Sequence, residues 1–97
     1  MNFEWDKQKN RINIRKHGFD FTNAWQVFTR PMLSALDERQ DYDEERWVGI
    51  GLLNTKVVVV IFTEPDENTI RIISLRKALN YERIEYERTF SNRLGAD

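Results

Sequence analysis

Apolar and polar positions recur with two different periods along the chain, and these periods predict helices near both ends and strands between them. All positions from residue 57 to 62 are apolar and mostly β-branched (VVVVIF). Such a run is typical of a strand that is buried on both faces, so we expect residues 56–63 at the centre of a sheet. Shorter β-type runs occupy residues 3–5, 32–36, 46–53 and 69–75.

The connections between the last four predicted strands are mostly short. Asn54-Thr55 is predicted to form a turn, and residues 64–68 are predicted to form a loop. Parallel pairing requires long crossovers, so these connections favour a largely antiparallel meander. Gly49 and Gly51 lie within a strand that no helix follows, which favours a β-bulge over a glycine-rich phosphate loop.

Helical periodicity is found in three segments. Asp6 is a candidate N-cap, and Gly18 a candidate stop, for a helix that runs to about Lys16. This helix has only two aliphatic residues, so we expect it on the surface, held mainly by its ends. A second helix is predicted over residues 21–29, and a third from residue 79 or 80 to 91.

Composition limits the class of protein. The 97 residues suffice for one domain, which we assign to residues 1–97. The absence of cysteine excludes disulfides, thiolate metal sites and a thiol nucleophile. The longest apolar run is far shorter than the roughly 20 residues of a spanning helix, and the N-terminus lacks the apolar segment of a signal peptide. We therefore expect a soluble, cytoplasmic protein that does not bind membranes.

The net charge of −1 conceals a separation of charge along the chain. Residues 7–16 carry five cations and no acid, residues 37–45 carry six acids and one arginine, and residues 71–77 are basic again. Local clusters of this kind focus an electric field on a cleft even when the net charge is small. The simplest interpretation of the acidic stretch is a solvated loop, and solvated faces are also the alternative for the basic stretches.

The chain lacks the residues of a metal site. Zinc sites combine His and Cys ligands, and His17 is the single histidine. The acids of residues 37–45 lack the glycine-punctuated spacing of a calcium loop. We therefore predict neither a metal nor another cofactor.

His17 is the one side chain whose unperturbed pKa lies near neutrality. At the end of the first predicted helix, the helix dipole favours its protonated form and Lys16 opposes it, so the roles of general acid and general base both stay open. Lys9, Asn13 and Lys16 form a polar stripe with His17 on this helix. The alternative is a histidine that only stabilises the end of the helix.

Arg71, Arg76 and Lys77 form a second basic group. Strand alternation places Arg71 and Arg76 on opposite faces unless the strand breaks near Ser74. Arg76 and Lys77 precede the last helix, where an anion would accept hydrogen bonds from both side chains and from helix N–H groups. The alternatives are two solvent-exposed cations, or an arginine paired with an acid of residues 37–45.

Together these groups favour metal-free cleavage of RNA over other reactions. Such cleavage requires deprotonation of the ribose 2′-OH, stabilisation of the phosphorane charge and protonation of the leaving oxygen, for which a His, several Arg or Lys and a Tyr or Glu suffice. Aromatic side chains beside a basic cleft stack on unpaired bases. The candidates are Trp5, Trp25, Trp47 and Tyr81, although most aromatic residues are expected in the core.

Three motifs follow one another between residues 3 and 86. They are Trp5-Asp6-x-x-Lys9-x-x-x-Asn13-x-x-Lys16-His17-Gly18, then Phe21-x-x-Ala24-x-x-Val27-Phe28, then Arg71-Ile72-Ile73-Ser74-x-Arg76-Lys77-Ala78 followed by Glu82-Arg83-x-x-Tyr86. In these motifs the chain resembles the BrnT family of bacterial type II toxins. One departure is Leu79, where members often have Thr, so we expect Asn80 to cap the last helix instead.

The resemblance implies an α+β, RelE-like ribonuclease fold, with a mostly antiparallel sheet, two N-terminal helices and one C-terminal helix. It implies a metal-independent endoribonuclease that cleaves cellular RNA and stops translation and growth. It also implies a hetero-oligomer with a BrnA-type antitoxin, whose ribbon-helix-helix domain would bind the operator DNA. An acidic antitoxin segment would cover the basic RNA-binding face.

The residues that match the family define the candidate site. We assign catalytic roles to His17, Arg71, Arg76 and Lys77, and RNA-binding roles to Lys9, Asn13, Lys16 and Tyr81. The match also includes Ser74, Glu82 and Tyr86. The alternative function is a non-catalytic, RelE-like interaction module that acts with a DNA-binding partner as a transcriptional co-repressor.

Overall fold

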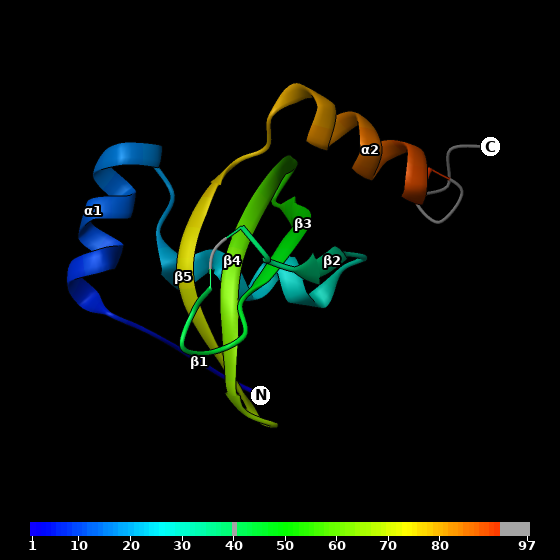
Figure 1. The fold of residues 1–97 in the computed structure, drawn as a ribbon. Coiled ribbons are helices and arrows are strands. Elements are labelled where there is room, and N and C mark those ends of the chain that lie inside the picture. Colours follow the sequence, from blue (N-terminus) through cyan, green and yellow to red (C-terminus); the bar gives the residue numbers. More distant parts are fainter. Residues whose placement is uncertain (40, 92–97) are drawn as a thin grey trace.

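The computed structural model describes residues 1–39 and 41–91, and its strands form one sheet in the order β1-β5-β4-β3-β2 (Figure 1). The strands are β1 (Asn2–Trp5), β2 (Leu33–Leu36), β3 (Trp47–Leu53), β4 (Lys56–Asp66) and β5 (Thr69–Lys77). The helices are α1 (Lys7–His17), the 3₁₀ helix η1 (Phe21–Thr29) and α2 (Asn80–Phe90). No helix among the described residues is long and apolar enough to cross a membrane.

The predicted meander is confirmed for β2 to β5, which pair antiparallel in chain order. The N-terminal strand β1 joins this meander by pairing parallel with β5. The fold is therefore α+β, with a mostly antiparallel five-stranded sheet and three helices in the part of the chain described here.

The predicted loop at residues 64–68 is shorter in the structure, because β4 continues to Asp66 and β5 begins at Thr69. The pairing of β3 with β4 reaches only to Phe62, so Pro65 lies where β4 has become an edge strand and a missing N–H group is tolerated. The turn is closed by the side chain of Asp66, which accepts a hydrogen bond of 2.8 Å from the backbone N–H of Asn68.

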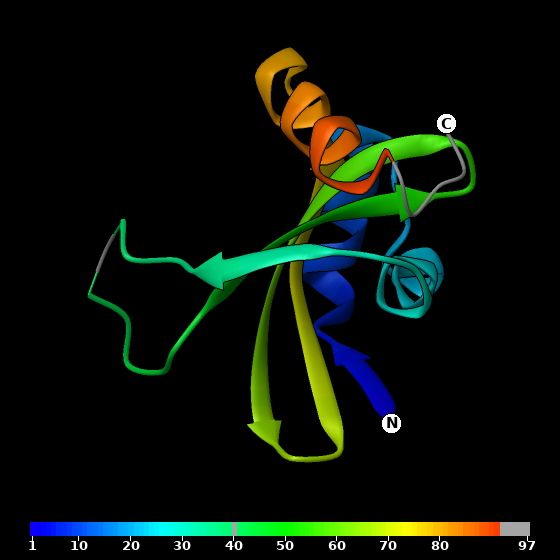
Figure 2. The same ribbon diagram turned by 90° about the vertical axis from the view of Figure 1, so that its right-hand side faces the viewer.

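One face of the sheet packs against η1, which lies behind the sheet in Figure 1 and beside it in Figure 2. The buried residues of η1, Phe21, Ala24 and Val27, recur every three positions and so share one side of a helix with three residues per turn. They meet Val58, Val60, Phe62, Ile70, Ile72 and Leu75 of the sheet. The helix predicted at residues 21–29 is confirmed in its bounds, as a 3₁₀ helix.

The two glycines of β3 create room for this packing. A Cβ atom on Gly51 would lie 2.8 Å from Val27 Cγ1, and one on Gly49 would lie 2.8 Å from Met32 Sδ. The register between β3 and β4 is continuous through both positions, so the β-bulge predicted there is wrong. The glycines are explained by the close approach of η1 and Met32 to the sheet.

The other face of the sheet packs against α2. Tyr86 and Phe90 are buried against Val57, Leu33, Ile50 and Leu52. The Tyr86 hydroxyl donates a hydrogen bond of 2.8 Å to the carbonyl of Pro31, which connects α2 to the segment before β2. These contacts hold α2 against β2, β3 and β4.

The start of α2 differs from the prediction. Its N-cap is Leu79, and Glu82 Oε1 accepts a hydrogen bond of 2.7 Å from the Leu79 backbone N–H. Asn80 is the first residue of the helix and not its cap, and its side chain accepts a hydrogen bond of 2.6 Å from Arg83 Nη2. The predicted pairing of Arg83 with Glu87 is confirmed at 3.0 Å.

Both predicted ends of α1 are confirmed. Asp6 accepts a hydrogen bond of 3.0 Å from Lys9 N, and Gly18 adopts the left-handed conformation with φ of 79°. The expectation that the helix is held mainly by its ends is wrong, because its middle residue Asn13 is buried and hydrogen-bonded to β5. In Figure 1, α1 accordingly lies beside β5.

Candidate functional site

A β-bulge in β5 determines which side chains share a face. Phe62 of β4 pairs with Ile72, and the next residue, Ile61, pairs with Ser74, so Ile73 is the extra residue. One inserted residue reverses the alternation of the strand beyond it. Arg71, Ser74 and Arg76 therefore lie on the same face. The sequence allowed Arg71 and Arg76 to share a face only if the strand breaks near Ser74, and the bulge is such a break.

Asn13 attaches α1 to the free edge of β5 beyond the bulge. Its amide nitrogen donates hydrogen bonds to the carbonyls of Leu75 (2.8 Å) and Phe19 (3.0 Å), and its oxygen accepts one from Leu75 N (3.1 Å). The side chain thus pairs with Leu75 as the backbone of another strand would. Asn13 is only 6% exposed, and all its donors have partners, so its position supports a role in placing α1 rather than in contacting RNA.

This attachment brings the basic side of α1 against the bulge. A shallow pocket of about 190 Å³ lies between the helix and the strand. It is lined by Lys9, Ile12, Asn13, Lys16, His17, Ile73 and Ser74, none of which is acidic. Four of the predicted site residues therefore line one cavity, and we call it the α1–β5 pocket.

The pKa of His17 lies below its ordinary value of 6.5. Partial burial is the main cause, and the positive charges of Lys16 and Arg76 lower the pKa further. These effects outweigh the helix dipole, which favours the charged form. The lowered pKa favours the neutral imidazole, the form that a general base requires.

The titration of His17 gives a direct check of this environment. We expect the midpoint of its imidazole ¹H chemical-shift titration to lie below pH 6.5 in the unmodified protein. In Lys16→Ala it should rise, though not fully to 6.5, because burial and Arg76 remain. Lys7→Ala removes the same charge from the first turn of α1 and should leave the midpoint in place. A midpoint at or above 6.5 in the unmodified protein would contradict the proposed environment.

Arg76 forms a bidentate ion pair with Glu82. Its two terminal nitrogens each lie 2.9 Å from a carboxylate oxygen of Glu82, and their hydrogen bonds raise the pKa of Arg76 and lower that of Glu82. The Arg76 side chain is 31% exposed and that of Glu82 only 10%. The carboxylate therefore holds the guanidinium from the inside of the protein and leaves its outer edge accessible.

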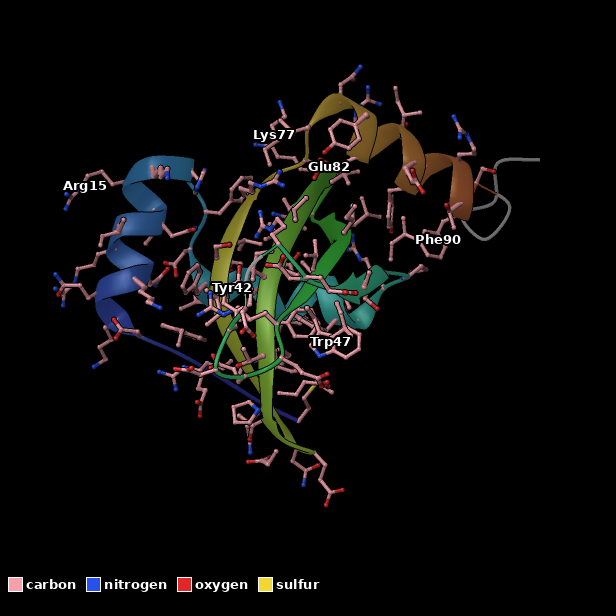
Figure 3. All side chains as sticks on the ribbon, in the orientation of Figure 1. Arg15, Tyr42, Trp47, Lys77, Glu82 and Phe90 are labelled. Atoms are coloured by element: carbon pink, nitrogen blue, oxygen red, sulfur yellow. The ribbon has the colours of Figure 1, made fainter. Side chains whose placement is uncertain are left out.

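Glu82 also occupies the place where an external anion was expected. One of its oxygens accepts the hydrogen bond from Leu79 N at the start of α2. The conflict between Arg76 and the positive end of the helix dipole is thus relieved by a side chain of the protein itself. Figure 3 shows Glu82 at the upper end of the sheet, where α2 begins.

Arg71 lines a different hollow, of about 470 Å³. It forms an ion pair of 2.7 Å with Glu4, and the same hollow is lined by Glu44, Glu45 and Glu64. Four carboxylates disfavour an RNA phosphate at this point. The catalytic role predicted for Arg71 therefore has less support from geometry than that of Arg76.

Lys77 and Tyr81 flank the start of α2. Lys77 is exposed, and alternation places it on the face of the sheet opposite to Arg76 (labelled in Figure 3). Tyr81 is 69% exposed and makes a minor contribution to the raised pKa of Arg76. Its exposed ring is free to stack on a base, whereas Lys77 lies on the other face from the bulge residues.

The acidic stretch contains a residue that the sequence analysis missed. Asp37 was expected in a solvated loop, but its side chain is 1% exposed. It accepts hydrogen bonds from Arg39 and from the Tyr42 hydroxyl, and the bonds from Arg39 are the main cause that lowers its pKa to about 2. The surrounding run of acids gave no signal that one of them is buried.

Acidic and histidine side chains do not gather into a metal site in residues 1–39 and 41–91. No group of three or more His, Cys, Asp or Glu residues there has a geometry that holds a metal ion. The cations that the fold brings around His17 are Lys9 and Lys16, which line the α1–β5 pocket, and the neighbouring Arg76.

Comparison with known proteins identifies a family and a solved structure that this chain resembles. The family model for the ribonuclease toxin BrnT of type II toxin–antitoxin systems matches residues 5–82. The 1.1 Å crystal structure of the Brucella abortus ribonuclease toxin BrnT is similar, with a TM-score of 0.64 and 28% sequence identity over 82% of this chain and 99% of that chain. A comparison with curated protein sequences gave no match.

The family match contains α1, the bulge of β5 and the Arg76–Glu82 ion pair, and so includes the complete α1–β5 pocket. The similar crystal structure supports the same assignment over nearly the whole of its own length. The chain belongs to the BrnT family of ribonuclease toxins of type II toxin–antitoxin systems.

Proposed function

We propose that this chain cleaves RNA at the α1–β5 pocket without a metal ion and thereby stops translation and growth. The observation that carries the proposal is the pocket itself, in which the His17 imidazole lies without any acid and beside Ser74, with Arg76 further along the same face of β5. A base and an adjacent cation are the two groups that cleavage at the ribose 2′-OH needs most.

The roles of the side chains follow from their positions. His17 would take the proton from the 2′-OH, and the resulting oxygen would attack the adjacent phosphorus. Arg76 would stabilise the phosphorane charge, while Lys9 and Lys16 hold neighbouring phosphates. As the bond to the 5′-oxygen breaks on the opposite side of the phosphorus, that oxygen would take a proton from water, and the imidazolium of His17 would release its proton to solvent. The products are a 2′,3′-cyclic phosphate and a free 5′-hydroxyl.

The same pocket favours a protein partner that shields it. A type II toxin implies an antitoxin, and we propose a BrnA-type antitoxin with a ribbon-helix-helix domain, which forms a hetero-oligomer with the toxin and binds operator DNA. An acidic segment of that antitoxin would complement the cations of the α1–β5 pocket. We further propose that the whole of residues 1–97 forms one RelE-like domain that acts in the cytoplasm.

Purified protein incubated with RNA in the presence of EDTA tests the proposal. We expect cleavage that survives the chelator, because the base and the charge stabiliser are side chains, and we expect 2′,3′-cyclic phosphate ends in the products. His17→Ala, incubated in parallel, should lose most of the activity. If the unmodified protein leaves RNA intact and does not arrest growth when produced alone, the co-repressor module becomes the better interpretation.

A further inference from the structure

The loop between β2 and β3 is described at residues 37–39 and 41–46, and it projects from the sheet on the side opposite to η1 (Figure 2). In Figure 1 it passes in front of β4 and β5. Glu44 and Glu45 from this loop line the same hollow as Arg71, which confirms that the loop lies over the face that carries Arg71 and Arg76.

Asp37 gives this loop a defined structure. Its backbone N–H donates a hydrogen bond of 2.7 Å to the carbonyl of Arg46, which closes the base of the loop. Its buried carboxylate accepts hydrogen bonds from Arg39 Nε (2.7 Å) and Nη2 (2.8 Å), and from the Tyr42 hydroxyl (3.2 Å). The Arg46 guanidinium in turn lies 4.2 Å from the centre of the Tyr42 ring.

Arg39 and Arg76 are held in the same manner. In both pairs the carboxylate is the more buried partner, with side-chain exposures of 1% for Asp37 and 10% for Glu82. The guanidinium is the more exposed partner, at 69% for Arg39 and 31% for Arg76. Within the described residues, Nη1 of Arg39 has no protein acceptor, so donors of a fixed guanidinium remain available to a ligand.

The two arginines act on each other electrostatically. Hydrogen bonds from Glu82 dominate the raised pKa of Arg76, and the positive charge of Arg39 opposes that rise. Arg76 is thus within electrostatic range of His17 from α1 and of Arg39 from the loop. An anion between the two guanidinium groups would relieve their repulsion, and an RNA strand carries a phosphate at every nucleotide.

We propose that Arg39 contacts the RNA phosphate next to the scissile one, and that Asp37 is its positioning residue. This inference rests on the proposed ribonuclease function and extends it by naming the loop that holds the substrate. A strand bound in this way runs from the α1–β5 pocket across Arg76 to the loop. Of the acidic stretch, Asp37 then belongs to the binding site because it orients the arginine, whereas Glu44 and Glu45 line the separate hollow of Arg71.

Binding of a non-cleavable 2′-O-methyl RNA oligonucleotide, followed by fluorescence anisotropy at several salt concentrations, tests the inference. In Arg39→Ala we expect a roughly tenfold weaker Kd, the effect of one lost charge-assisted hydrogen bond. The slope of log affinity against log salt concentration should fall by about 0.7, the value for one phosphate contact with a single strand. In cleavage of unmodified RNA, KM should rise while kcat changes little.

Two further variants separate a directed contact from a general effect of charge. Arg15→Ala removes an exposed arginine that points away from the sheet (labelled in Figure 3) and should leave both Kd and slope unchanged. Arg39→Lys keeps the charge but lacks the planar guanidinium group. Its salt slope should therefore equal that of the unmodified protein, while its affinity should lie between those of Arg39→Ala and the unmodified protein. Asp37→Asn should weaken binding in the same direction, because Arg39 loses its fixed orientation.

The outcomes distinguish this inference from the function on which it rests. If the unmodified protein binds and cleaves RNA and Arg39→Ala behaves like Arg15→Ala, Arg39 does not contact the substrate. If Arg39→Lys matches the unmodified protein in every respect, the positioned contact is likewise refuted. If the unmodified protein neither binds nor cleaves RNA, the proposed ribonuclease function itself fails. Arg39→Ala also leaves the buried Asp37 carboxylate without its arginine partner, so thermal unfolding is measured for each variant and binding is compared where all of them are folded.

Discussion

Replacing Arg76 by alanine is expected to slow RNA cleavage by at least about 10²-fold, the typical cost of removing a group that stabilises charge in the transition state. The bulge in β5 places the Arg76 guanidinium on the same face of the sheet as Ser74, and Glu82 orients it. Arg76→Lys should recover only part of the rate, because a single ammonium cannot reproduce the fork that contacts two phosphate oxygens. Single-turnover cleavage at saturating protein concentration measures the effect on the chemical step.

The substitution of Arg76 also leaves Glu82 without its ion-pair partner, so lost stability must be separated from lost catalysis. Glu82→Gln breaks the same ion pair but retains Arg76 and an oxygen that accepts from Leu79 N. We expect Glu82→Gln to lower the melting temperature about as much as Arg76→Ala while keeping far more activity. Equal loss of activity in the two variants would show that the ion pair only maintains the fold.

Asn13→Leu is expected to destabilise the protein by about 2–4 kcal/mol, because a side chain of similar size removes three hydrogen bonds, two of them buried. The N–H and carbonyl groups of Leu75 are then left without partners at the edge of β5. The free energy of unfolding in urea measures this loss. Because α1 is no longer held against the bulge, RNA cleavage should fall with it.

Asn13→Asp tests the hydrogen bonds themselves. It keeps an oxygen for Leu75 N but points a carboxylate oxygen at the carbonyls of Leu75 and Phe19. We expect a large loss of stability at pH 7 that decreases as the pH falls and is smallest below about pH 4, because the buried site raises the pKa of the new carboxyl group and the protonated group donates again. Asn23→Ala, at an exposed position of η1, should change the stability little. An Asn13→Asp variant as stable as the unmodified protein at pH 7 would refute the anchoring role.

Local signals in the sequence predicted the elements well. Asp6 and Gly18 delimit α1, and the β-branched run at residues 57–62 lies at the centre of the sheet between β3 and β5. These predictions succeeded because caps, periodicity and short connections depend on residues close together in the chain. The bounds of β4 and the N-cap of α2 were missed because they depend on sheet neighbours and on the Glu82 side chain.

The arrangement of the site depended on contacts between distant parts of the chain. The bulge at Ile73 is a property of the register between β4 and β5. The sequence alone indicated only that Arg71 and Arg76 would share a face if the strand broke near Ser74. The burial of Asn13 could not be predicted from its place on a polar helix, because its partner in β5, Leu75, is remote in sequence. Asp37 was missed for a different reason, because its partners Arg39 and Tyr42 are close in the chain but nothing in the sequence distinguishes it from the exposed acids around it.

The separation of 62 residues between Asn13 and Leu75 has a consequence for protein synthesis. The N-terminal strand and helix are made first, yet β1 can pair only with β5, and α1 can attach only to the edge of β5. Long-range contacts of this kind form late in folding. The cationic pocket is therefore absent from the growing chain, and it can assemble only after β5 has left the ribosome.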